Sequence, residues 1–421
     1  MKVTAIIAEF NPFHSGHAWL IDYAKRVRGA DYIVILMSGN FVQRGEPAIF
    51  DKFTRTRMAL SCGADLVLEL PTAFATASAR EFARASAALA DKTGLIDELL
   101  FGIEGISTSI YNSEQLSDAA QLDFLQEAAL LLASESSEFQ SEFRQQLAAG
   151  ASYPRARAEA VSHMAGSKNT PEVLLQLLSK PNSILAVEYL QALHLRSSQI
   201  RPALALRQGD GYHANIPSGS PFASATALRQ LLLSGKSVSA YVPDCLSAFY
   251  KDAVCIGPDA LDLPLQQRLL AILYDGADFE RYADVSPEIA GRLRRNAAKR
   301  YGFQMHIENL WTKQYTRSRI SRALLHILLG ITKEQTERLK QADYIPFLRV
   351  LGFSKAARSG LLPALKRCAK VPVVTRPAAA RDLLCDELYY SDFYYMLQAH
   401  ALRHTLLPPV KNELEQQIVI V

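Results

Sequence analysis

Short apolar runs alternate with helical patterns along the first hundred residues. Four runs have the continuous apolar character of strands covered on both faces, and they span Val3–Ala8, Tyr32–Met37, Asp65–Leu70 and Glu98–Phe101. Between these runs, apolar residues recur at helical spacing over His17–Val27 and Ser78–Asp91. Strands separated by helices pair in parallel through right-handed crossovers, so the pattern predicts an α/β fold with a doubly wound sheet.

Beyond residue 113 the pattern becomes mainly helical. Residues 113–200 are rich in Leu and Ala at helical spacing, Ile200–Arg207 predicts a returning strand, and another helix begins near Ser224. After residue 240 the strand signals fade, apart from a short possible strand in the final Ile-Val-Ile-Val. Helical patterns continue over 261–275, 286–300, 317–330, 333–340 and 355–370. We therefore expect two domains, 1–240 with a helical insertion at about 113–200, and a mainly helical 241–421.

The composition is that of a globular protein. The chain has 421 residues, of which 49% are hydrophobic and 21% charged, and its net charge is only +4. Its five cysteines are scattered without the close spacing of a zinc site or a redox motif, which indicates reduced thiols in a cytoplasmic protein. No run approaches the ~20 apolar residues of a membrane span, so no membrane association is expected.

The most informative motif directly follows the first predicted strand. It reads Phe-Asn-Pro-Phe-His-Ser-Gly-His over residues 10–17 and opens the first helix. The first loop of such a sheet favours phosphate binding, because a glycine admits close approach and the helix start offers free N–H groups. His14 and His17 can then donate hydrogen bonds to a phosphoryl group in transfer. A fortuitous helix start or half of a metal site is the alternative, but no nearby Cys or third His completes a metal set.

A second cluster lies at the later helix start. Ser224 is a candidate N-cap, and Thr226 and Arg229 fall in the first turns. Hydroxyls, N–H groups and a guanidinium at one helix start can hold an oxyanion, although simple capping explains most such pairs of hydroxyls. Paired with the histidine loop, the cluster indicates that both faces of a triphosphate are held.

These features together resemble a known group of enzymes. The strand, the F-N-P-F-H-x-G-H motif and the later S-x-T-x-x-R closely resemble the HxGH nucleotidyltransferase superfamily. Longer motifs resemble one member family, the bacterial tRNA(Met) cytidine acetate ligases: S-G-N-F-V-Q-R-G-E-P-A at 38–48, D-K at 51–52, G-A-D-L-V at 63–67, E-L-P at 69–71, F-G-x-E at 101–104, K-P-N-x-I-L at 180–185, E-Y-L at 188–190 and Y-T-R-x-R at 315–319. The departures from the family pattern are Ile103, Ser183, Ala186 and Ala223.

The resemblance implies a Rossmann-like HxGH nucleotidyltransferase domain, a mainly helical C-terminal domain and a two-step reaction. Acetate and ATP would give acetyladenylate and pyrophosphate, and the acetyl group would then pass to N4 of the wobble cytidine of elongator tRNA(Met). Carried over to this sequence, ATP contacts fall on Ile7, Ala8, Glu9, Phe10, Asn11, Pro12, Phe13, His14, Ser15, Gly16, His17, Ala18, Trp19, Leu20, Gly102, Asn182 and Arg207. Mg²⁺ is expected on the phosphates of ATP, with no metal site of the protein itself.

Basic residues gather in one part of the predicted helical domain. Residues 286–322 carry a local net charge of +7 with Tyr301, Trp311 and Tyr315 interleaved, a pattern suited to an RNA backbone and unpaired bases. The candidate tRNA-binding residues are Arg292, Arg294, Arg295, Lys299, Arg300, Arg317 and Arg319. Amphipathic helices with solvated arginines are the alternative. Arg44, Lys52 and Arg55, in a polar loop, are open to three roles: acetate binding, tRNA contact or simple solvation.

Two other functions remain open from the sequence. An adenylyltransferase acting on a small phosphorylated cofactor precursor would share the first domain but leave the basic helices without a task. A nucleotide-sensing RNA-binding protein without catalysis would have no need of His14 and His17.

Overall fold

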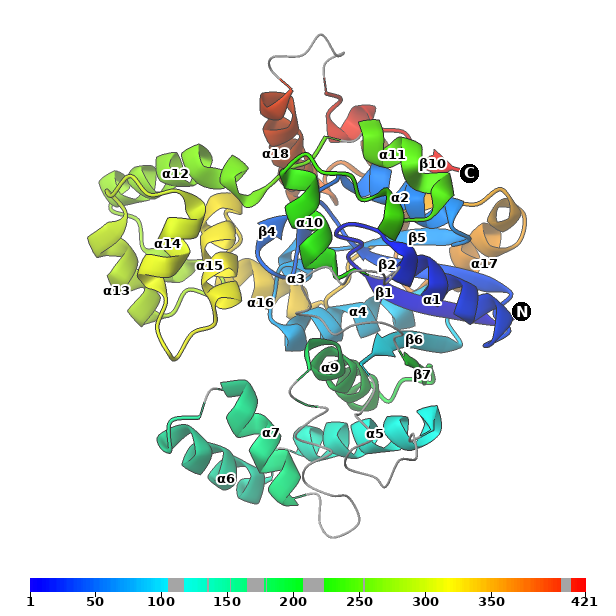
Figure 1. The fold of residues 1–421 in the computed structure, drawn as a ribbon, viewed down its shortest axis with the longest axis horizontal. Helices are drawn as coiled ribbons and strands as arrows, with labels where there is room; N and C mark the ends of the chain where they lie inside the picture. Colours follow the sequence, from blue (N-terminus) through cyan, green and yellow to red (C-terminus); the bar gives the residue numbers. More distant parts are fainter. Residues whose placement is uncertain are drawn as a thin grey trace.

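A mainly parallel sheet forms the centre of the protein (Figure 1). The computed structural model describes residues 1–104, 117–134, 136–151, 153–164, 178, 180–206, 223–252, 254–402 and 410–421. Five parallel strands confirm the predicted runs to within two residues, and they are β1 (Val3–Ala8), β2 (Tyr32–Ser38), β5 (Leu66–Leu70), β6 (Glu98–Ile103) and β7 (Arg201–Leu206). The sheet has eight strands in the described part of the chain, in the order β10 (Val419–Ile420), β8 (Leu348–Phe353), β5, β2, β1, β6 and β7, with β9 (Val373–Val374) paired to β8 off this path.

Helices cover both faces of the sheet, which explains the continuous apolar runs. In β2, Ile33 and Ile35 face one hydrophobic cluster, while Val34 and Leu36 face the other. Helices α1 (Ser15–Arg26) and α2 (Lys52–Ser61) pack in the first cluster. Helices α4 (Ala79–Thr93) and α9 (Pro181–Leu195) pack in the second.

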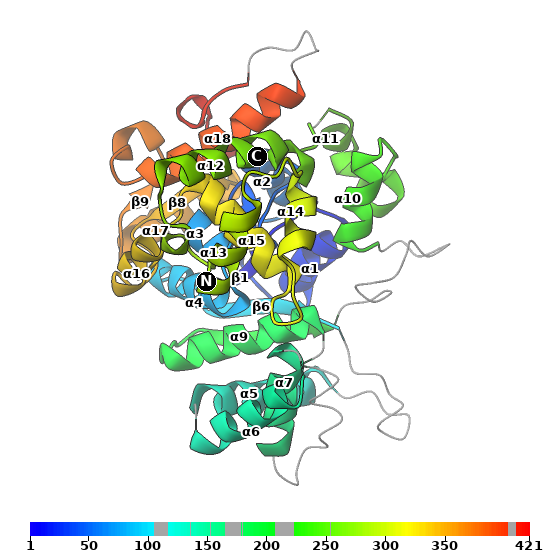
Figure 2. The same cartoon turned by 90° about the vertical axis from the view of Figure 1, so that its left-hand side faces the viewer.

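The predicted insertion is helical where the structure describes it. Helices α5 (Asp118–Ser134), α6 (Ser137–Ala148) and α7 (Tyr153–Met164) lie together beyond α9, at the lower end of both views (Figures 1 and 2). Helix α9 joins this group to the sheet, because it packs on both α4 and α5.

Residues beyond 240 form a second group of helices beside the sheet. Four of them gather at the left of Figure 1, and they are α12 (Asp262–Asp275), α13 (Pro287–Asn296), α14 (Phe303–Leu310) and α15 (Arg317–Leu329). They are followed by α16 (Lys333–Gln341), α17 (Leu361–Cys368) and α18 (Cys385–Ala401). The sequence pattern predicted these helices except α14 and α18. No helix in the described part of the chain has the length and apolar character needed to cross a bilayer.

The C-terminal residues also extend the central sheet, which the prediction of a mainly helical second domain missed. Strand β8 (Leu348–Phe353) pairs antiparallel with β5, and β9 (Val373–Val374) and β10 (Val419–Ile420) pair parallel with β8. A buried arginine, Arg349, interrupts the apolar run of β8, and the run's partner strand lies some 280 residues earlier. The short C-terminal strand was predicted. Its place in this sheet was not.

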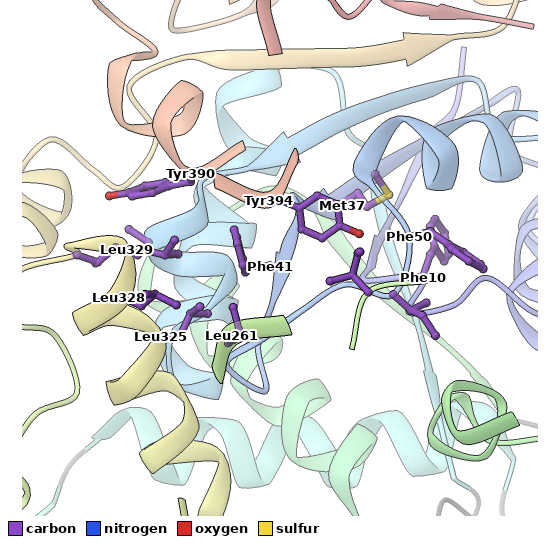
Figure 3. Close-up of a cluster of buried hydrophobic side chains, with 14 of the residues drawn as sticks. Phe10, Met37, Phe41, Phe50, Leu261, Leu325, Leu328, Leu329, Tyr390 and Tyr394 are labelled. Carbon is purple, nitrogen blue, oxygen red and sulfur yellow. The ribbon is translucent and has the colours of Figure 1, made fainter. Parts of the chain in front are cut away.

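The two parts of the chain share one hydrophobic core. Figure 3 shows buried side chains from opposite ends of the sequence in one cluster, with Phe10 and Phe50 at one end, Leu325 and Tyr390 at the other, and Tyr394 between them. The hairpin of β3 (Phe41–Val42) and β4 (Glu46–Pro47) also touches α15, where a Cβ on Gly45 would overlap the backbone of Arg322. A division of the chain near residue 240 therefore does not separate two independent cores.

Candidate active site

The segment that joins β1 to the first turn of α1 carries both predicted histidines, at the carboxyl end of the sheet. Its two phenylalanines are buried, with the ring centroids of Phe10 and Phe13 4.8 Å apart, and they anchor the loop in the core. Phe10 takes a left-handed φ of +49°, a conformation uncommon for a bulky side chain. Asn11 adds a further tie, because its side-chain oxygen accepts the backbone N–H of Ile49 at 2.8 Å.

His14 and His17 form a stacked pair at the start of α1. Their ring centroids lie 3.8 Å apart at an interplanar angle of 28°. His14 is the N-cap residue, and its Nδ1 accepts the N–H of Gly16 at 3.1 Å. The Nδ1 of His17 accepts the backbone N–H of His14 at 3.2 Å, in the manner of a capping box.

These hydrogen bonds determine which nitrogen of each ring carries the proton. An imidazole nitrogen that accepts a hydrogen bond is unprotonated, so the neutral rings of both His14 and His17 carry hydrogen on Nε2. Each ring can therefore present an N–H donor to a phosphate oxygen. The two histidines of the motif are thus oriented hydrogen-bond donors at a helix N-terminus.

The second predicted cluster reaches the same loop. Helix α10 (Ala225–Leu233) begins at Ser224, whose hydroxyl accepts the N–H of Ala227 at 3.2 Å. The guanidinium of Arg229 donates to the carbonyl of Asn11 at 2.7 Å and to the Thr226 hydroxyl at 3.2 Å. The structure therefore brings Thr226 and Arg229 to the histidine loop, as the sequence predicted, while the described role of Ser224 is capping.

Four charged groups surround this junction. The carboxylate of Glu9 accepts the N–H of Gln43 at 2.7 Å, and burial raises its pKa against the opposing effects of Gln43, Arg44 and Arg229. Burial likewise raises the pKa of Glu46, and Arg229 and Arg44 oppose that rise. Burial lowers the pKa of Arg229, and the like charge of Arg44 lowers it further. Two positive charges therefore repel each other beside the histidine loop.

Two other predicted ATP contacts, Gly102 and Asn182, lie on β6 and at the start of α9. Gly102 is near the carboxyl end of β6, and Asn182 lies in the first turn of α9, where its amide donates to a Glu104 carboxylate oxygen. The second oxygen of that carboxylate is buried and has no hydrogen-bond partner among the described residues. Arg207 lies outside the described residues.

Two of the three basic residues left open by the sequence are buried structural groups. The Lys52 ammonium contacts Glu69 at 2.8 Å, Glu413 at 3.0 Å and the Ser391 hydroxyl at 2.9 Å. The suggested solvated basic face is therefore wrong for Lys52 and Arg55. Both side chains are fully buried. The neighbouring residues in the sequence are polar and do not indicate this burial, because the acidic partners of Lys52, Glu69 and Glu413, lie elsewhere in the chain.

Arg55 holds together the loops that carry the site. Its guanidinium donates to the carbonyls of Phe50 at 2.9 Å, Glu9 at 2.6 Å and Ser38 at 3.1 Å, and also to the carbonyl of Gly39. These carbonyls end β1 and β2 and precede α2. Arg55 is thus a positioning residue for the histidine loop.

Sequence reasoning also missed two contacts made by the segment that follows α10. The carbonyl of Tyr241 accepts the hydroxyl of Ser15 at 2.9 Å, and the Tyr250 hydroxyl donates to the carbonyl of Phe13. No local pattern marks either tyrosine, because each bond joins residues more than two hundred positions apart.

The seven predicted tRNA-binding residues lie on α13, α15 and the turn after α13; we call them the basic helical surface. Arg294, Arg295, Lys299, Arg300 and Arg317 are exposed, whereas Arg292 and Arg319 are half-buried. Their surroundings are partly acidic, since Arg294 pairs with Asp278 at 2.7 Å and Arg317 with Glu308 at 2.6 Å. The local excess of +7 in the sequence is thus partly offset in space.

Aromatic residues on this surface are covered by arginines. The guanidinium of Arg317 lies 4.5 Å from the centroid of the Trp311 ring, which is 40% exposed, and that of Arg319 lies 4.8 Å from the Tyr315 ring. Arg322, which contributes to the local charge, is buried and pairs with Asp284 at 2.9 Å.

The described part of the chain contains no group of three or more His, Cys, Asp or Glu side chains that could hold a metal ion. A cavity of about 300 Å³ lies between α16 and α18, and one of about 530 Å³ between α5 and α9. Neither contains a predicted site residue.

A parallel sheet whose first loop presents two oriented histidines at a helix start defines a nucleotidyltransferase of the HxGH class. Residues 1–412 match the HIGH Nucleotidyl Transferase family model. The tRNA(Met) cytidine acetate ligase of Fervidobacterium nodosum is 34% identical over 388 residues, covering 91% of this chain and 86% of the relative. That of Lysinibacillus sphaericus is 32% identical over 427 residues, covering 98% and 100%. The chain belongs to the tRNA(Met) cytidine acetate ligase family of HIGH nucleotidyltransferases.

Solved structures agree with this assignment along the whole chain. Thermotoga maritima TmcAL bound with alpha-thio ATP is similar with a TM-score of 0.85 and 28% identity, covering 100% of this chain and 99% of that one. The apo form of the same protein is similar with a TM-score of 0.87 and 28% identity, covering 100% of both chains.

Proposed function

We propose that this protein is an ATP-dependent ligase that acetylates N4 of the wobble cytidine of elongator tRNA(Met). Acetate attacks the α-phosphate of ATP to give acetyladenylate and pyrophosphate. The cytidine amine then attacks the acetyl carbon, and AMP leaves. The observation that carries the proposal is the stacked His14/His17 pair, with both Nε2–H donors at the start of α1 and Arg229 bonded to the same loop.

The first step needs charge neutralisation and alignment more than proton transfer. Acetate is already anionic at neutral pH, so no general base is required. His14 and His17 stabilise the phosphoryl oxygens where charge grows, because oriented N–H donors act most strongly at a helix N-terminus. Arg229, with the sequence-predicted Arg207, neutralises the rest of the polyphosphate.

Gly102 and Asn182 take the nucleoside end of ATP in this proposal. A backbone without a side chain at Gly102 admits a base or ribose, and the Asn182 amide both donates and accepts. The alpha-thio ATP named for the Thermotoga maritima relative supports a nucleotide in this fold. Mg²⁺ enters as part of the substrate MgATP in this proposal, bound by the phosphate oxygens.

Arg44 is our candidate for the acetate carboxylate. Arg44 is half-buried, and its positive charge lowers the pKa of both Glu9 and Arg229, so it lies near the histidine loop. A guanidinium beside the transferring phosphate can hold a carboxylate by two hydrogen bonds.

The basic helical surface is our candidate for the tRNA contact. Its exposed arginines and lysines can neutralise phosphates, and Trp311 and Tyr315 can exchange their arginine partners for unpaired bases. We place the protein in the cytoplasm, where tRNA and ATP are found.

Labelled acetate, ATP and total tRNA test the whole proposal in one reaction. We expect N4-acetylcytidine in the hydrolysed tRNA, formed only when ATP is present and accompanied by pyrophosphate. Acetyl-CoA in place of acetate and ATP should give none. Pyrophosphate release that depends on a phosphomonoester and ignores acetate would replace the proposal with a cofactor adenylyltransferase. Turnover with neither substrate would leave a nucleotide-binding protein without catalysis.

A further inference from the structure

Two cysteines that are distant in sequence meet where the C-terminal end of α2 lies against the segment that follows α10. Cys62 caps the C-terminal end of α2, and Cys245 lies in the short 3-10 helix Asp244–Leu246. Their Sγ atoms are 4.0 Å apart across 183 residues. Cys62 is half-buried and Cys245 is exposed, so one sulfur is sheltered and the other meets solvent.

The segment that contains Cys245 lies on the histidine loop; we call residues 224–250 the covering segment. It contacts that loop at three points, through Arg229 on Asn11, Tyr241 on Ser15 and Tyr250 on Phe13. All three contacts are single hydrogen bonds. The Tyr250 ring also packs on Phe50, with centroids 5.4 Å apart. Cys245 lies between Tyr241 and Tyr250, opposite the end of α2.

We propose that Cys62 and Cys245 are a reversible oxidation site, whose disulfide fastens the covering segment to α2. The bond requires a sulfur separation of about 2.05 Å, so the two atoms must approach by roughly 2 Å. Side-chain rotation and a small shift of an exposed short helix supply that movement. The inference is independent of the proposed reaction, because it rests on the thiol pair and the covering contacts alone.

The chemistry follows from the exposure of the two thiols. The Cys245 thiolate attacks a small-molecule disulfide, forms a mixed disulfide and releases one thiol. Cys62 then loses its proton to solvent, its sulfur attacks Cys245 Sγ and the second thiol leaves. Two protein thiols are oxidised while one disulfide is reduced. Burial and the neighbouring Cys245 raise the pKa of Cys62 to about 12, so Cys245 is the point of entry.

The disulfide would hold the covering segment closed over the loop. The three hydrogen bonds can open one at a time, whereas a covalent bond removes the open conformations. Local opening of residues 237–251 should therefore become rarer in the oxidised protein. The same bond links residues far apart along the chain, so it also constrains the unfolded state.

Oxidised glutathione tests the site on the full-length reduced protein. Trypsin cleaves after Arg57, Arg80, Lys236 and Lys251, so Cys62 falls in residues 58–80, Cys245 in 237–251, and Cys255 in a different peptide. We expect a linked pair of peptides 58–80 and 237–251, lighter by two hydrogens than the sum. We also expect amide exchange over 237–251 to slow by about tenfold or more, and reduction to restore it.

Single substitutions provide the controls. Cys62→Ser and Cys245→Ser should each abolish the linked peptides and the change in exchange, whereas Cys368→Ser, at an exposed cysteine elsewhere, should keep both. A stable glutathione adduct on Cys245 without the link would overturn the proposal. So would a link between Cys245 and Cys255, or a link that leaves amide exchange unchanged.

Discussion

The guanidinium of Arg229 donates a 2.7 Å hydrogen bond to the backbone carbonyl of Asn11, across 218 residues of sequence. This bond joins the start of α10 to the loop that ends in the stacked histidines. Two helix N-termini therefore meet at one edge of the sheet, where their dipoles and side-chain donors favour an anion. Substitutions at this site and at its supports should have separable effects on each substrate.

Replacing His17 by Ala should remove one of the two phosphate donors. We expect acetate-dependent pyrophosphate release to fall by about 10²–10³-fold, as for the loss of one donor to a developing charge. Binding of tRNA should stay nearly unchanged, because the basic helical surface lies on other helices. Filter binding and a pyrophosphate assay measure the two effects, and His163→Ala, at an exposed histidine of α7, is the control. Equal loss of both functions would contradict the assigned role.

Replacing Arg229 by Ala should release the histidine loop as well as remove a charge. The loop loses its bond at Asn11, so we expect KM for ATP to rise and kcat for adenylate formation to fall, by about tenfold or more together. Arg229→Lys should rescue little, since an ammonium lacks the planar fork that spans Asn11 and Thr226. Arg201→Ala, at an exposed arginine that begins β7, should be neutral. Full activity of Arg229→Lys would show that only the positive charge of this residue is needed, and would contradict the predicted role of its planar guanidinium.

Replacing Arg44 by Ala should act on acetate. We expect KM for acetate to rise by about tenfold or more while KM for ATP changes less, because removing a carboxylate partner affects the smaller substrate first. Initial-rate kinetics with each substrate varied in turn separate the two constants. An unchanged KM for acetate would remove Arg44 from the acetate site.

Replacing Arg294 and Arg295 together by Ala should weaken tRNA binding. For every phosphate that the variant no longer neutralises, the slope of log affinity against log salt should fall by about 0.7–0.9, while adenylate formation without tRNA stays intact. Lys366→Ala with Arg367→Ala is a matched control, since this pair is also exposed and ends helix α17. An unchanged salt slope in the first variant would exclude those arginines from the interface.

Replacing Glu387 by Gln should change how stability depends on pH. The Glu387 carboxyl on α18 accepts both the N–H and the hydroxyl of Thr72, and burial, with the charge of Glu69, raises its pKa to about 8. The folded state therefore binds this proton more tightly than the unfolded state. Its stabilising effect is complete below about pH 4.5 and is lost as pH rises through 8.

The Gln variant mimics the protonated carboxyl at every pH. Its unfolding free energy should match that of the wild type near pH 4.5 and exceed it increasingly up to pH 8, by at most about 1.4 kcal/mol per pH unit. Urea unfolding at several pH values measures the difference. Glu334→Gln on the exposed face of α16 should show no such trend. A constant difference across the range would contradict the raised pKa.

Local pattern was sufficient for the parallel strands and for the histidine loop. The apolar runs of β1 and β2 are continuous because helices cover both faces, and that continuity is visible within six or seven residues. His14 and His17 close a capping box within one turn, so their geometry is encoded in adjacent residues. Strand β8 was missed for the opposite reason. Its Arg349 is a charged residue that interrupts the apolar pattern, and inside the protein it pairs with Glu413 at 3.4 Å and donates to the carbonyl of Val350.

The sequence by itself predicted the parallel strands and the helix starts at His14 and Ser224, because both follow from local periodicity and capping residues, while the resemblance of its motifs indicated the nucleotidyltransferase class. Only the tertiary structure shows that Arg229 donates a hydrogen bond to Asn11 and that Arg55 donates one to the carbonyl of Glu9. It also shows that Lys52 is buried in an ion pair with Glu69. The physical reason is that burying a charge depends on where its partners lie in space. Those partners are as far as 361 positions away for Lys52, beyond the reach of any local pattern.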